Sequence, residues 1–285
     1  MASIPSTFPA TPASQRAWLD QAVRVWFIVT AIGQTIFFLY ITGYYAPPVA
    51  RGTLADWSKY RDLITGHVPG DSFGNAMFGV HVALAALLTL GGVLQLWPAL
   101  RRRVPALHRW NGRLFVVAAL LAALGGLWLV WGRNSRLSAA SDASITLNAV
   151  LVLGFVTLAW QAARARDFAA HQDWAMRAFF VVSGVWFLRV GIMGFALIAV
   201  GVFGADKALV EAAFPVMSFA SYLVPLGVYE LYRRARRSPA PAAQGAMAAG
   251  LLALTLVMAA GIFGATMMMW LPPLKASLTA SGLFG

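Results

Sequence analysis

The sequence has no cysteine and little charge. The missing thiols exclude disulfides, thiolate metal sites and cysteine nucleophiles. Charged residues make up 11% of the 285 residues and hydrophobic residues 60%. In soluble domains about a quarter of all residues are charged. This composition excludes an ordinary soluble domain and indicates a chain that is embedded in a lipid bilayer.

Seven apolar runs divide the chain. A transmembrane helix needs about 20 residues, and runs near this length lie at 23–44, 75–98, 112–132, 144–163, 175–203, 210–231 and 246–270. They predict an all-α polytopic membrane protein with about seven transmembrane helices. We expect residues 1–20, rich in Ser, Thr, Pro and Ala, to form a disordered tail, residues 21–274 a single transmembrane domain, and residues 275–285 a short outer tail.

Basic residues are concentrated in three links between these runs. The segments "RRRVPALHRWNGR", "ARARDFAAHQDWAMR" and "RRARRSPAPAAQ" follow the second, fourth and sixth runs, so they share one side of the membrane with the N-terminus. The positive-inside rule assigns that side to the cytoplasm of a bacterial inner membrane and places the C-terminus outside. The net charge of +12 favours anionic lipid headgroups as partners. A nucleic-acid partner is not expected, because the basic residues lie in short links.

Two of these links repeat one pattern. Trp97 precedes His108 by eleven residues, Trp160 precedes His171 by eleven, and an arginine cluster lies within each interval. The apolar segments "LFVV" and "AFFVV" follow. The pattern predicts two copies of a helix hairpin, 75–132 and 144–203, which pair as a duplicated four-helix core. The first, sixth and seventh spans then pack outside this core.

Residues that favour helix starts precede both histidines. Pro105 suits the first turn of a helix, and Asp167 suits an N-cap. We therefore expect His108 and His171 in the first turns of spans three and five, near the cytoplasmic headgroups.

A family resemblance follows from these motifs. The segments "GGVLQLWPALRRRVPALHRWNGRLF", "HQDWAMRAFF" and "WFLRVG" resemble the bacterial membrane proteins catalogued as domain of unknown function 2306, over roughly residues 76–200. The most specific parts are His-Arg-Trp-x-Gly-Arg at 108–113 and His-x-x-Trp-x-x-Arg at 171–177. "HQDW" lacks the basic residue that the resemblance implies directly after the second histidine. The resemblance supports the topology and brings no settled activity.

The repeated histidines suit a haem. Low-spin haem needs two neutral imidazoles that face each other across the iron, and paired helices supply this geometry. His108 and His171 are therefore a candidate bis-histidine site for haem b, with Arg109, Arg113 and Arg177 neutralising the propionates. Such a redox protein would exchange electrons with a quinone. Interfacial His, Trp and Arg also anchor helix ends to headgroups, so a purely interfacial role stays open.

Polar residues inside the spans predict a second, outer pocket. His81 lies sixteen residues before Trp97, and Arg189 lies eighteen residues after His171, so helix geometry places both at a similar depth. A charge near the bilayer centre costs about 2.5–3.5 kcal/mol, so Arg189 should face a partner or a cavity. The candidate partners are His81, Asn148, Ser218, Tyr222, a helix carbonyl or an anionic ligand. A ligand-binding and a structural role for Arg189 both stay open.

A different class of function fits the same arginines. Arg109, Arg113, Arg177 and Arg189 would bind an anionic lipid or a small anion in a non-catalytic protein, with a role in transport, as a subunit of a membrane complex, or in assembly. His67 lies beside Gly and Pro in an outer loop and is interpreted as an exposed loop residue. The sequence contains neither a phosphate-binding loop nor a zincin motif. Whether the protein is an enzyme stays open.

Overall fold

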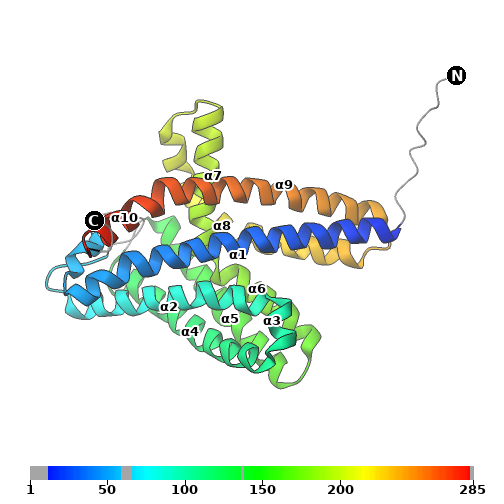
Figure 1. The fold of residues 1–285 in the computed structure, drawn as a ribbon, viewed down its shortest axis with the longest axis horizontal. Coiled ribbons are helices and arrows are strands. Elements are labelled where there is room, and N and C mark those ends of the chain that lie inside the picture. Colours follow the sequence, from blue (N-terminus) through cyan, green and yellow to red (C-terminus); the bar gives the residue numbers. More distant parts are fainter. Residues whose placement is uncertain (1–11, 59–65, 136–137, 283–285) are drawn as a thin grey trace.

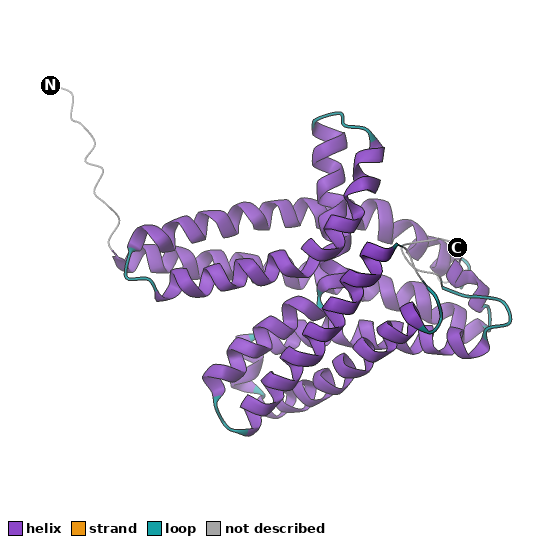
Figure 2. Ribbon diagram, turned by 180° about the vertical axis from the view of Figure 1, so that it is seen from behind, coloured by secondary structure: helices purple, strands orange, loops and turns teal. Residues whose placement is uncertain are grey.

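The computed structural model describes residues 12–58, 66–135 and 138–282. Every regular element of this part is helical (Figure 2). The elements are α1 (Pro12–Arg51), the 3-10 helix η1 (Leu54–Ser58), α2 (Ser72–Leu96), α3 (Pro98–Arg103), α4 (Pro105–Trp131), α5 (Ala139–Arg164), α6 (Phe168–Val182), α7 (Gly184–Ala196), the π-helix η2 (Leu197–Val202), α8 (Lys207–Arg237), α9 (Pro241–Ala265), the π-helix η3 (Thr266–Trp270) and α10 (Leu271–Thr279).

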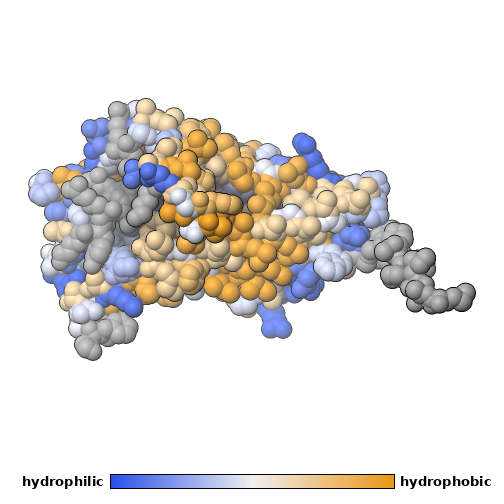
Figure 3. Space-filling model, turned by 90° about the horizontal axis from the view of Figure 1, so that it is seen from above, coloured by the Kyte–Doolittle hydropathy of each residue, from blue (hydrophilic) through white to orange (hydrophobic). Residues whose placement is uncertain are grey.

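Seven helices of the described chain are long and apolar enough to cross a membrane, which confirms the predicted fold class. The three basic links and the start of α1 lie at one end of the long axis, which we call the basic end (Figure 1). An apolar belt lies between the more hydrophilic ends of the molecule (Figure 3). The alternation of the links is therefore as expected, while the assignment of the basic end to the cytoplasm stays a prediction.

The two predicted hairpins form and lie side by side. Helix α2 packs on α4, α5 packs on α6, and α4 joins the two hairpins by packing on α5. The contacts are close because small side chains line them, as at Ala118 and Ala119, which are both 1% exposed. Helices α1 and α9 pack against each other along their length, and α1 also covers α2.

The second hairpin departs from the expected repeat after Val182. The fifth span is broken at Ser183, so that α6 stays with the core, whereas α7 packs on α8 and α9. The turn from the end of α7 through η2 into the start of α8 projects from the body of the molecule in both ribbon views (Figures 1 and 2). The expected four-helix core therefore holds only α6 from this span, because a Ser-Gly pair and side chains from other helices interrupt the helix there.

The predicted boundaries at the chain ends also need correction. Helix α1 begins at Pro12, so residues 12–20 are helical and not a disordered tail; residues 1–11 lie outside the described residues. The cause is burial, since Leu19 is 1% exposed and packs in one cluster with Leu251 of α9. Helix α10 continues to Thr279, so the expected outer tail begins as helix.

Candidate functional site

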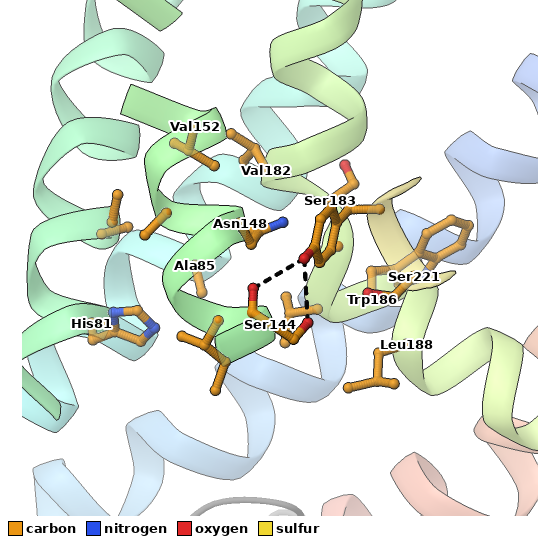
Figure 4. Close-up of a pocket in the computed structure, with 18 of the residues that line it drawn as sticks. His81, Ala85, Ser144, Asn148, Val152, Val182, Ser183, Trp186, Leu188 and Ser221 are labelled. Carbon is orange, nitrogen blue, oxygen red and sulfur yellow. Dashed lines mark hydrogen bonds between the residues drawn. The ribbon is translucent and has the colours of Figure 1, made fainter. Parts of the chain in front are cut away.

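A cavity of about 270 Å³ lies in the apolar interior of the molecule. Residues of α1, α2, α4, α5 and α8 line it, together with the segment where α6 meets α7. Its apolar lining includes Phe78, Ala123, Ala149 and Val152. Figure 4 shows polar side chains from several helices around it, among them His81, Ser144, Asn148 and Ser183. An apolar cavity with a few converging polar groups is the usual form of a small-molecule site.

The fifth span is broken where it lines this cavity. The amide of Ser183 bonds to the carbonyl of Phe179 at 2.9 Å, whereas the amides of Trp186 and Phe187 both bond to the carbonyl of Ser183 at 3.0 Å. Helix α7 thus starts a new ladder of hydrogen bonds at Gly184, with no side-chain cap from Ser183. The N-terminal end of a helix therefore lies inside the protein.

Two neighbouring helices supply the polar groups that stabilise the break. Gln34 of α1 donates Nε2 to Oγ of Ser183 at 3.2 Å, and Asn148 of α5 donates Nδ2 to the carbonyl of Val181 at 3.0 Å. A Cβ at position 184 would lie 3.1 Å from Nδ2 of Asn148, so Gly184 leaves room for that amide. Irregular backbone at membrane depth is tolerated only with such partners.

Arg189 lines the cavity as a buried cation. Its side chain folds back along α7, donates Nη1 to the carbonyl of Val185 at 3.1 Å and lies over the ring of Phe37 at 5.6 Å. Arg189 is 5% exposed. Within the described chain its Nε has no hydrogen-bond partner and no carboxylate pairs with it. Of the protein groups predicted as its partners, the helix carbonyl is the one that bonds to it among the described residues, and the anionic ligand stays a prediction.

His81 faces the same cavity from α2. Its Nδ1 is buried and has no partner in the described part of the protein. The ring lies against Gly125 and Gly126 of α4, where an added Cβ would come within 3.6 Å and 3.3 Å of it. The structure thus brings the three predicted residues of the outer pocket, His81, Asn148 and Arg189, to one cavity.

Sequence reasoning missed three further cavity residues. Gln34 and Ser183 hold the broken helix, and Trp186 is 1% exposed with an Nε1 that finds no partner among the described residues. A single Gln inside the apolar run "TAIGQTIFF" and the Ser-Gly pair in "FFVVSGVWF" were the available signals. Tyr222 also lines the cavity, and its hydroxyl donates to the carbonyl of Ser144 at 3.1 Å.

The predicted histidine pair lies at the basic end, outside this cavity. Pro105 starts α4 and Asp167 caps α6, as expected, and each histidine is the fourth residue of its helix. Nδ1 of His171 lies 2.9 Å from the carbonyl oxygen of Ala159, which fixes Nδ1 as the protonated nitrogen because a carbonyl only accepts. Nδ1 of His108 is buried without a partner in the described chain. The two imidazoles are near enough for their charges to interact.

The arginines beside these histidines repeat one contact. Arg113 lies 4.8 Å from the ring centre of Trp110, and Arg177 lies 4.7 Å from that of Trp174. The matched pairs support the duplication of the hairpin. The two arginines differ otherwise, because Arg177 also forms an ion pair with Glu230 of α8 at 2.6 Å.

The surroundings of these arginines limit what they can bind. Arg109 is exposed. Glu230 pairs with Arg177 and Arg233, so Arg177 already has a carboxylate partner. Among the described residues no group of three or more His, Cys, Asp or Glu side chains is placed to hold a metal ion. A haem would therefore rest on the two histidines and find its free cations in Arg109 and Arg113.

Comparison with known sequences identifies the family. The sequence model of the family described as "Predicted membrane protein (DUF2306)" matches residues 78–232, more than half of the chain. The chain belongs to this family. The match confirms the resemblance and extends it into α8, so it contains the histidine pair, Asn148 and Arg189. Neither the curated proteins nor the solved structures contain a match to the chain.

Proposed function

We propose that this DUF2306 protein binds a small amphipathic molecule in the central cavity. The observation that carries the proposal is a pair of buried polar residues beside one apolar cavity: Nδ1 of His81 and Nε of Arg189 have no hydrogen-bond partner within the described chain. Buried polar groups in proteins almost always have partners. A ligand with acceptor groups would supply them, and its apolar part would contact the apolar lining.

The break in the fifth span supports the same conclusion. Many membrane transporters bind their substrates at discontinuous helices near the middle of the membrane. Here Gln34 and Asn148 form hydrogen bonds at the break, where the regular ladder of the helix is interrupted. Placing these polar groups in the membrane lowers the stability of the protein relative to an unbroken apolar helix. A binding site at the break would explain why the protein contains this less stable arrangement.

Two neighbouring positions of α5 provide a matched test. Ala149 is 5% exposed and lines the cavity, whereas Val150 is 56% exposed and faces outward. The test measures saturable binding of radiolabelled octanoate and 1-octanol to the protein in nanodiscs by scintillation proximity. We expect at least one probe to bind, Ala149→Phe to abolish this binding and Val150→Phe to preserve it. Absence of saturable binding of both probes, or equal binding by the two variants, would contradict the proposal.

A second candidate function, haem b binding between His108 and His171, rests on a separate observation. The bond from His171 to the carbonyl of Ala159 leaves Nε2 free in the tautomer that ligating histidines adopt. His108 has an unsatisfied buried nitrogen, and the two rings occupy equivalent helix positions. The two histidines would hold the haem iron, with Arg109 and Arg113 beside the propionates. A haem there would supply one-electron transfer, with a quinone as the expected partner.

An optical spectrum tests this second function. We expect the purified protein, expressed with a haem supplement, to show a Soret band that sharpens on reduction with dithionite, together with split α and β bands. His108→Ala and His171→Ala should each abolish the low-spin spectrum, and His67→Ala should leave it unchanged. A featureless spectrum, or a full low-spin spectrum in either of the first two variants, would refute the bis-histidine site.

A further inference from the structure

The charge balance around the cavity points to the kind of ligand. Two arginines of the described chain have side chains deep in the protein. Arg133 donates Nε to the carboxylate of Asp71 at 2.8 Å and is therefore neutralised by the chain itself. Arg189, 5% exposed, has only the carbonyl of Val185 and the ring of Phe37 beside it. A buried cation is stable only with a counter-charge, and for Arg189 the described residues do not provide one.

The helix break lies at the same end of the cavity. Helix α7 has 13 residues and begins at Gly184, inside the protein, with no side-chain cap. Because α6 ends at Val182, the partial negative charge of its C-terminal end offsets the partial positive charge of this start. Nη1 of Arg189 bonds to the carbonyl of Val185, the second residue of α7. The guanidinium is therefore the positive charge that a ligand meets beside the break.

Nε of Arg189 is the direct sign that a polar ligand belongs there. The side chain is 5% exposed and lines the cavity, and this N–H has no partner among the described residues. A guanidinium presents several donors in one plane, which suits an oxyanion with two acceptor atoms. Its single positive charge matches a monoanion better than a dianion.

The rest of the cavity lining indicates the size and polarity of the remainder of the ligand. The cavity volume of about 270 Å³ lies near the lower limit of small-molecule sites, about 300 Å³. Apolar side chains such as Val152 and Ala123 cover most of it away from Arg189. The ligand is therefore small and has a short apolar body behind its charged group.

We propose that the cavity binds a small amphipathic carboxylate, with its carboxylate group between Arg189 and the first turn of α7 and its apolar body toward α4 and α5. This inference rests on the proposed function and specifies its ligand class. Because the carboxylate is the counter-ion of Arg189, its binding depends on the positive charge at position 189. The binding of a neutral molecule of the same shape would not depend on this charge.

The test compares octanoate with 1-octanol, which have similar apolar bodies and differ in charge. Both are measured at pH 7 by scintillation proximity, with the protein in nanodiscs of zwitterionic lipid. We expect octanoate to bind at least tenfold more tightly than 1-octanol. Arg189→Gln should weaken octanoate binding at least tenfold and leave 1-octanol binding within about twofold, which also shows that the cavity is intact. Arg189→Lys should keep part of the preference, and Arg102→Gln, at an exposed arginine of α3 outside the cavity, should keep all of it.

The other outcomes separate the inference from the function on which it rests. If 1-octanol binds as tightly as octanoate and Ala149→Phe abolishes both, the cavity binds ligands but the carboxylate assignment is wrong. If neither probe binds saturably, both proposals fail. If inorganic phosphate displaces octanoate at the concentrations at which octanoate itself binds, the site takes a bare oxyanion, and the amphipathic class is refuted.

Discussion

Arg189 donates Nη1 to the carbonyl of Val185, 3.1 Å away on the same helix. This bond draws the guanidinium toward the start of α7 and away from the lipid-facing surface, so that it lines the cavity. It leaves the charge uncompensated by any carboxylate of the described chain. An arginine inside the membrane costs free energy. This contact turns its side chain toward the helix break and the cavity, where a ligand can compensate the charge.

The approach of α7 to α9 depends on Gly261. A Cβ there would lie 2.2 Å from the carbonyl oxygen of Val190, so Gly261→Ala must push the helices apart. We expect a loss of about 1–3 kcal/mol in the free energy of unfolding, measured by equilibrium unfolding in mixed micelles. Gly250→Ala on the same helix is the control, because nothing lies within 4 Å of its added Cβ. Equal effects of the two substitutions would contradict the close packing at Gly261.

Asn148 should matter more than a similar amide elsewhere in the core. Asn148→Val removes the donor to the Val181 carbonyl at the helix break, and we expect a loss of about 1–3 kcal/mol in unfolding free energy, because that carbonyl is left buried and unpaired. Asn111→Val removes a similar bond to Gly91, whose carbonyl lies within the regular part of α2. The control should lose only about 0.6 kcal/mol. A larger loss for Asn111→Val would refute the role of Asn148 at the break.

Asp71, which lies outside the membrane-spanning segments, should make the stability of the protein sensitive to acid. The amide of Gly74 and then the guanidinium of Arg133 hold the pKa of this carboxyl below its ordinary value of 3.8. Because the folded protein favours the carboxylate, its stabilisation is complete above pH 3.8 and is lost as the pH falls through the lowered pKa. The difference in melting temperature between the wild type and Asp71→Asn should therefore be constant at higher pH and shrink below pH 3.8. A difference in melting temperature that grows as the pH falls would contradict a lowered pKa of Asp71.

Local signals in the sequence were sufficient for the number and approximate positions of the membrane-length helices. Long apolar runs require membrane-length helices whatever their partners, and Pro105 and Asp167 act on the backbone of their own helix starts. His81 and Arg189 were placed at a similar depth by counting residues along helices, and both line one cavity with Asn148, a predicted partner of Arg189. Predictions that depend on a single helix thus carried over to the structure.

Features that depend on distant segments could not be read in this way. In the run "FFVVSGVWFLR" the Ser-Gly pair alone does not require a break, because the break at Ser183 also uses the side chains of Gln34 and Asn148 from other helices. The start of α1 at Pro12 depends on the burial of Leu19 in a cluster with α9. Both depend on tertiary contacts, which composition and periodicity do not contain.

The measurement that tests the central claim most directly is the thermal stability of Arg189→Met in ligand-free detergent, beside that of Arg133→Met. An uncompensated buried cation destabilises the empty protein, so we predict that Arg189→Met raises the melting temperature, whereas Arg133→Met lowers it by leaving Asp71 without its partner. Octanoate should then stabilise the wild type and leave Arg189→Met unchanged. If Arg189→Met instead lowers the melting temperature as Arg133→Met does, Arg189 is a structural residue and the account is wrong.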